Sequence, residues 1–186
     1  MHLPAHPTHT GFTRGAMGRL VLGCLALLLS SCGSDGTTNS GGEHSFEHVP
    51  ERYRALAETV HAQQERWASN GFSTYQYTYQ RSCFCVPDWT RPVVIDVKDN
   101  RIRRLVYADD EAPVGPTYWK SYHTVEELFA LIDSALVRDA AQVTVLFDEA
   151  LGYPTQLYID EDLRIADEEL GIMSSDVRSQ PQPFTL

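Results

Sequence analysis

Hydrophobic and polar positions change their period within the first half of the folded chain. The segment Val49-Pro50-Glu51 suits a helix start, and apolar residues at helical spacing follow it as far as Asn70-Gly71. Residues 74–80 instead alternate polar with aromatic side chains, as a strand with one buried face does. A β-branched run over residues 92–97 comes next, and after a tight turn at Asp99-Asn100 the chain returns as a further strand over residues 102–107. The pattern therefore predicts one helix and then three strands.

The same order recurs further along the chain. Thr124 and Glu127 have the spacing of a capping box, and the apolar residues after them fall on one helical face. Segments 142–147 and 155–159, with a weaker one at 168–177, predict three more strands. We therefore predict an α+β fold, in which two helix–three-strand units form one antiparallel sheet with the helices packed on one face.

Aromatic residues of the first predicted strand share one of its faces: Tyr75, Tyr77 and Tyr79. Such a stripe can serve as a binding platform or pack beneath a helix, and we favour packing. A second group of aromatic residues lies in residues 108–123, the longest gap between predicted elements, and long ordered loops are often functional. The predicted contact surface for a protein partner of the cell envelope is therefore Tyr118, Trp119 and Tyr122.

The N-terminal segment has the pattern of an export signal. Arg14 and Arg19 precede an apolar run over residues 20–29, which is shorter than the roughly 20 residues of a spanning helix. Leu29-Ser30-Ser31-Cys32 resembles a bacterial lipobox. This resemblance implies cleavage before Cys32, a diacylglycerol on its sulfur and an acyl chain such as palmitate on the new amine. The alternative is an ordinary secretory signal that leaves Cys32 as a free thiol.

The signal sets the expected organisation of the chain. We expect a signal peptide over residues 1–31, a flexible tether over 32–47 and a single α+β domain over 48–186. The tether is rich in Gly, Ser, Thr and Asn, which cannot build a core. Acyl chains on Cys32 would hold the domain at a membrane. Gly33 favours the outer membrane, with the domain facing the periplasm.

The charge and the motifs of the chain argue against several classes of function. The chain has 25 acidic and 15 basic residues and a net charge of −10, which opposes nucleic-acid binding. Its acidic clusters lack the ligand spacing of a calcium loop, and no nucleophile elbow, phosphate loop or zinc-protease motif is present. We therefore expect no catalytic residue, no metal and no cofactor.

Cys83-Phe84-Cys85 is the sharpest local motif of the folded part. In an exported protein the two thiols are expected to form a structural disulfide, since Cys32 is expected to carry lipid. Residues i and i+2 of a strand lie about 6.6 Å apart, so this bridge requires a bend. Metal binding by two thiolates and redox catalysis by a low-pKa thiolate are the alternatives.

Several short motifs follow one another along the folded part: Tyr75-Gln76-Tyr77, Cys83-Phe84-Cys85-Val86-Pro87, Thr124-Val125-Glu126-Glu127-Leu128-Phe129, Gly152-Tyr153-Pro154 and Asp167-Glu168-Glu169-Leu170. With them the sequence resembles a family of bacterial lipoproteins that share a domain of unknown function. The resemblance spans about residues 67–177 and implies no activity, cofactor or catalytic residue.

Two functional hypotheses follow from the sequence. The first is a non-enzymatic, membrane-tethered module for binding or envelope maintenance. The alternative is a thiol-based redox or copper-handling module centred on Cys83 and Cys85.

Overall fold

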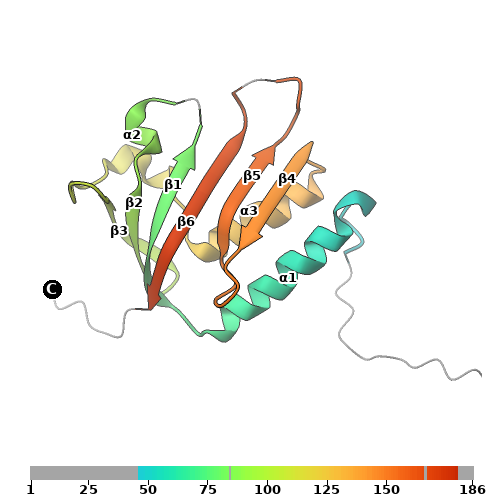
Figure 1. The fold of residues 1–186 in the computed structure, drawn as a ribbon, viewed down its shortest axis with the longest axis horizontal. Helices are drawn as coiled ribbons and strands as arrows, with labels where there is room; N and C mark the ends of the chain where they lie inside the picture. Colours follow the sequence, from blue (N-terminus) through green and yellow to red (C-terminus); the bar gives the residue numbers. More distant parts are fainter. Residues whose placement is uncertain (1–45, 84, 166, 180–186) are drawn as a thin grey trace, which may run out of the picture. The chain divides into compact units, whose positions relative to one another are not determined.

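A computed structural model describes residues 46–83, 85–165 and 167–179, and shows helices and strands in the predicted order (Figure 1). The elements are η1 (Glu51–Tyr53), α1 (Arg54–Ser69), β1 (Thr74–Ser82), α2 (Pro87–Thr90), β2 (Val93–Lys98), β3 (Arg101–Tyr107), η2 (Pro116–Ser121), α3 (Val125–Val137), β4 (Gln142–Phe147), β5 (Pro154–Asp160) and β6 (Leu170–Ser179). Here η denotes a 3₁₀ helix. Two short elements, α2 and η2, lie in segments that the sequence pattern left as loops.

All six strands form one antiparallel sheet in the order β3-β2-β1-β6-β5-β4. At its centre β1 pairs with β6 from Tyr75↔Ser179 to Ser82↔Gly171. The predicted α+β class and the single antiparallel sheet are confirmed. The finer prediction is corrected: the structure has one six-stranded sheet rather than two three-stranded units. Periodicity identifies strands but not their neighbours, and the pairing of β1 with β6 joins the halves into one layer.

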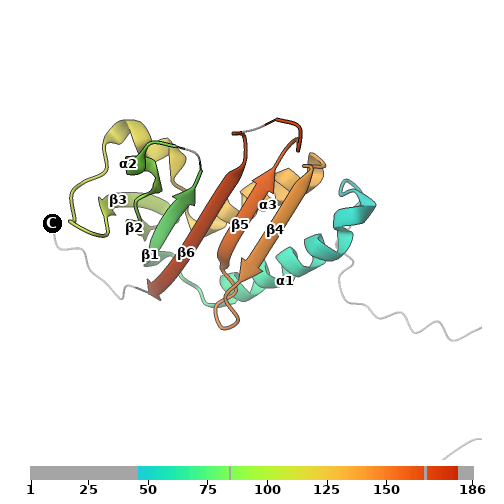
Figure 2. The same cartoon turned by 45° about the horizontal axis from the view of Figure 1, so that its top comes forward.

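The two long helices, α1 and α3, lie on one face of the sheet (Figures 1 and 2). The predicted capping box is present, because the Thr124 hydroxyl accepts from the Glu127 N–H and the Glu127 carboxylate accepts from the Thr124 N–H. α1 begins at Arg54, later than predicted, because η1 occupies the preceding turn. Of the helices among the described residues, none is long and apolar enough to cross a membrane.

The core lies between this helical layer and the sheet. Tyr75, Tyr77 and Tyr79 of β1 are at most 1 % exposed, and Phe129 of α3 is fully buried. Burial of each such side chain stabilises the fold by about 1.5–3 kcal/mol. The tyrosine stripe therefore packs beneath the helices, as favoured from the sequence, and provides no surface platform.

The edge strand β3 differs from the rest of this acidic chain in its charge. It carries Arg101, Arg103 and Arg104, and all three are exposed. Charged side chains on an edge strand discourage pairing with another sheet. Arg104 lies 3.5 Å from the buried carboxylate of Asp96, whereas the other two arginines have no hydrogen-bond or ion-pair partner within the described ranges.

Candidate functional site

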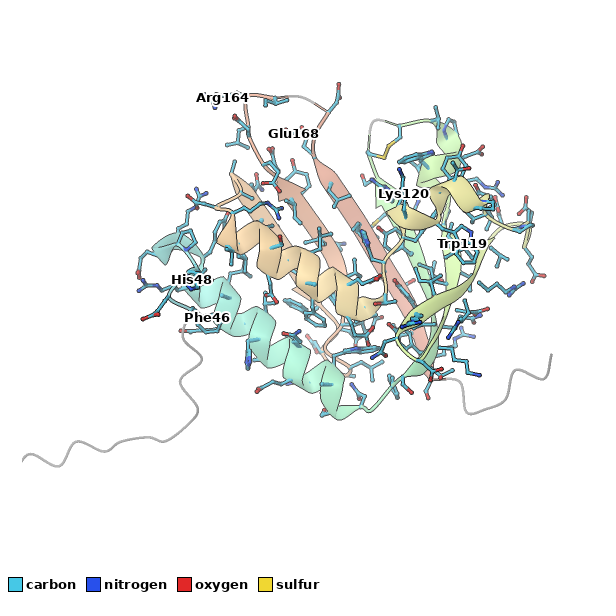
Figure 3. The ribbon with its side chains drawn as sticks, turned by 180° about the vertical axis from the view of Figure 1, so that it is seen from behind. Phe46, His48, Trp119, Lys120, Arg164 and Glu168 are labelled. Carbon is cyan, nitrogen blue, oxygen red and sulfur yellow. A yellow bond between two sulfur atoms is a disulfide. The ribbon has the colours of Figure 1, made fainter. Side chains whose placement is uncertain are left out.

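An open groove of about 600 Å³ lies between β3, η2 and α3. Its apolar lining comes from all three elements and includes Ile102, Trp119 and Leu131. Arg101 of β3 and Lys120 of η2 line it as well. Figure 3 shows Trp119 and Lys120 on η2, beside α3. Three segments far apart in the sequence thus build one recess.

The wall of the groove is held by the hydroxyls of the buried tyrosines. Tyr75 donates to Oε2 of Glu126 at 2.8 Å and accepts from the backbone N–H of Val125 at 2.9 Å. Tyr77 donates to the backbone carbonyl of His123. The next residue of the stripe, Tyr79, lies 3.4 Å from the carbonyl of Ser121. Successive tyrosines of β1 therefore bind successive positions between the first turn of α3 and the last residue of η2.

The carboxylate of Glu126, in the first turn of α3, also forms a hydrogen bond to α1. Its Oε1 accepts from the indole Nε1 of Trp67, on α1, at 2.9 Å. Its second oxygen accepts from Tyr75. One carboxylate thereby ties the start of α3 to α1 and to β1, which fixes the helix that forms one side of the groove.

The three predicted contact residues have different environments in the structure. Trp119 is half-buried, lines the groove and donates its indole N–H to the Val114 carbonyl at 3.1 Å. Tyr118 is exposed and packs edge-to-face on Trp89 of α2, 5.6 Å between ring centres. Tyr122 is only 6 % exposed. They do not form one exposed patch, and contact of this segment with a partner stays a prediction.

The cations of the groove are free to meet a ligand. In the part of the chain that the structure describes, neither Arg101 nor Lys120 has a hydrogen-bond or ion-pair partner. His123 also lines the groove, but burial lowers the pKa of its imidazole, which is therefore neutral at pH 7. Glu127 accepts a hydrogen bond from the Thr124 N–H in the capping box. The groove therefore presents two unpaired cations and one carboxylate, with a net positive charge.

The chemistry that this arrangement offers is recognition. Cationic side chains beside an apolar lining can hold an anionic group and cover an apolar one. Across the described ranges, no group of three or more His, Cys, Asp or Glu side chains is placed to hold a metal ion. The groove lining contains Glu127 and a neutral His123 but no cysteine.

The cysteine pair lies outside the groove, at the end of β1. Cys83 and Cys85 are joined through sulfur, with their Cα atoms 5.3 Å apart, on the loop drawn with a yellow bond in Figure 3. β1 ends at Ser82, so the chain leaves the strand as the predicted bridge requires. Cys85 and the following Val86 are exposed.

The cysteine loop contacts the groove wall through stacked side chains. The guanidinium of Arg81 lies 5.2 Å from the ring centre of Trp89, which packs on Tyr118. Arg81 also donates to the Ser121 carbonyl at 3.3 Å. The loop after β1 and the 3₁₀ helix η2 are thus packed together.

Sequence patterns did not identify the groove residues Arg101, Ile102, Lys120 and Leu131. One signal was present: four basic residues fall within residues 98–104 of an acidic chain. The predicted lipidation site Cys32 lies outside the described residues.

The chain matches a known protein family. The model of the Family of unknown function (DUF6174) matches residues 59–179, which include most of α1, all of α3 and the six strands of the sheet. No curated protein and no solved structure matches significantly.

Proposed function

Because the chain belongs to the Family of unknown function (DUF6174), its role has to be argued from its own residues, and we propose a non-enzymatic binding module whose ligand occupies the groove. The observation that supports this proposal most directly is the groove itself. It has an apolar lining and the two unpaired cations Arg101 and Lys120. Its volume of about 600 Å³ falls within the range of small-molecule sites.

The proposal includes a place for the module in the cell. Cleavage before Cys32 and acylation of this residue would anchor the domain to the outer membrane, facing the periplasm, through a tether over residues 32–47. A role in envelope maintenance, with an envelope protein as partner, fits this place. The acidic charge of −10 argues against nucleic acid.

Filling the groove should abolish ligand binding without unfolding the domain. Ala130 lines the groove and is exposed, so Ala130→Trp places an indole in the recess at little cost in stability. We expect native mass spectrometry of full-length protein from an exporting host to show a bound small molecule, and Ala130→Trp to lose it.

The matched control is Ala55→Trp, which adds the same side chain at an exposed position of α1 outside the groove. It should retain the bound molecule. Equal occupancy in Ala130→Trp and the unmodified protein would contradict the proposed site, and so would the absence of any bound molecule from the unmodified protein.

Thiol–disulfide exchange is a second candidate, favoured by the exposure of Cys85 and by the small ring that its disulfide closes. A bridge that closes a loop of three residues contributes only about 1.6 kcal/mol through chain entropy. A thiolate of a partner dithiol would attack one sulfur and release the other as a thiolate. The second partner thiol would then complete the partner's disulfide and leave both cysteines reduced. Copper(I) binding would require this reduced pair.

A redox titration separates the two roles of the cysteine pair. Cys83→Ser/Cys85→Ser should remain folded and lose about 1.6 kcal/mol of unfolding free energy at most, measured by urea denaturation. If the pair exchanges thiols, it should equilibrate with glutathione buffers at about −180 to −250 mV, measured by alkylation and intact mass. A potential below about −300 mV would exclude the redox role and leave a structural bridge.

A further inference from the structure

We infer that the ligand of the groove is an amphiphilic anion, a single carboxylate-type headgroup on an apolar chain. This inference rests on the proposed binding function and adds the chemical class of the ligand. It follows from which side chains surround the recess and from which of them lack partners.

The headgroup is assigned from the two unpaired cations. Arg101 stands on β3 and Lys120 on η2, so two different walls of the groove supply positive charge. A guanidinium offers two parallel donors to a carboxylate, and an ammonium adds a point charge. Among the lining residues that the structure describes, Glu127 is the only acid, and its carboxylate is bonded to the Thr124 N–H. The local charge therefore favours an anion.

The apolar chain is assigned from the remaining lining. Ile102, Trp119, Ala130 and Leu131 contribute hydrocarbon or aromatic surface. The hydrogen bond from the Trp119 indole to the Val114 carbonyl holds this wall in one orientation. A pre-ordered wall lowers the entropic cost of binding. A ligand with a charge alone would leave this surface uncovered.

The occupant is one molecule rather than a bilayer surface. Its site is a recess between three elements, and the chain around it carries a net charge of −10. An anionic membrane is repelled by an acidic protein, whereas a single small anion can enter a locally cationic groove.

The test uses dodecanoate as the probe, with the full chain and calorimetric detection below the micelle concentration. Dodecanoate should bind at least about tenfold more tightly than dodecyltrimethylammonium, which has the same chain and the opposite charge. It should also bind at least about tenfold more tightly than butyrate, which has the same headgroup and a short chain. Equal binding of either comparison compound would overturn the assignment.

Charge reversals locate the headgroup. Arg101→Glu and Lys120→Glu should each weaken dodecanoate binding at least about tenfold. Arg103→Glu is the matched control, because Arg103 is exposed on the same strand but does not line the groove, and it should change affinity less than about twofold. Equal losses in Arg101→Glu and Arg103→Glu would reduce the effect to general charge and overturn the inference.

The failure of the ligand class is distinguishable from failure of the binding function. If a co-purified molecule without an anionic group is lost in Ala130→Trp, the groove is a binding site and the inferred class is wrong. If no co-purified molecule is found, or if dodecanoate binds Ala130→Trp as well as the unmodified protein, the groove is not the proposed binding site and both proposals fail.

Discussion

Above pH 10, the free energy of unfolding should fall by at least about 4 kcal/mol per pH unit, because the three buried hydroxyls of Tyr75, Tyr77 and Tyr79 keep their protons in the folded domain. Burial raises the pKa of Tyr75, Tyr77 and Tyr79 far above the ordinary value of 10.0. The carboxylate of Glu126 adds to this rise for Tyr75.

The sign follows from proton binding. Below pH 10 both states are protonated, and the tyrosines contribute their full stabilisation. Above this pH the unfolded chain releases protons that the folded domain retains, so the unfolded state is progressively favoured. Each hydroxyl contributes about 1.4 kcal/mol per pH unit until the pH reaches its pKa in the folded state.

Two measurements check this expectation. Urea denaturation followed by circular dichroism, at pH values on both sides of 10, gives the slope, and tyrosinate absorbance counts the ionised hydroxyls. Tyr77→Phe should reduce the slope by about 1.4 kcal/mol per pH unit, since one buried hydroxyl is removed. Titration of all nine tyrosines near pH 10 in the folded protein would contradict the prediction.

Gly152→Ala should lower the free energy of unfolding by about 2–5 kcal/mol. Gly152 has φ +83°, and a Cβ at this position would lie 2.7 Å from the Gln63 carbonyl oxygen and 2.9 Å from the Arg66 Cβ. Both neighbours belong to α1, so the helix or the turn has to move. Arg66 also donates to the Glu149 carbonyl at 2.8 Å, and this contact between helix and turn would be strained.

Gly71→Ala is the matched control for the steric part of this effect. Gly71 has φ +66°, but a Cβ there meets nothing within 4 Å, so only the backbone cost of about 1–2 kcal/mol applies. Urea denaturation of both variants measures the difference. Equal losses would show that the close approach of the turn to α1 does not constrain the fold.

Local patterns predicted the elements of this fold well. The capping box of Thr124 and Glu127 marked the start of α3, and the run at residues 142–147 matches β4. Both signals depend on neighbours within a few residues, which the sequence displays directly. Strand neighbours depend instead on contacts across the whole chain, and the predicted three-stranded units were corrected for this reason.

The 3₁₀ helix η2 left no such signal. Pro116–Ser121 is too short for an apolar period, and its place is set by the bond from Trp119 to Val114 and by the packing of Tyr118 on Trp89. The sequence shows three aromatic residues within residues 108–123, but it could not show that Tyr122 is buried while Tyr118 is exposed.

The groove could not be predicted from the sequence, because its lining residues come together only when the chain folds. Arg101, Lys120 and Leu131 are far apart in sequence and meet where β3, η2 and α3 converge. That the two cations lack acidic partners is a property of the folded surface. The sequence shows a net charge of −10 for the whole chain but not which charges lie side by side after folding.

The pairing of β1 with β6 affects how the domain folds during its synthesis. β1 ends at Ser82, but its partner β6 begins only at Leu170. Pairing of these two central strands therefore closes a chain loop that contains most of the domain. The hairpins β1–β2 and β2–β3 can form during synthesis, whereas β1 keeps an unpaired edge until β6 emerges. Chains that stop short of β6 should therefore expose a long, aromatic-rich strand and be prone to aggregation and proteolysis.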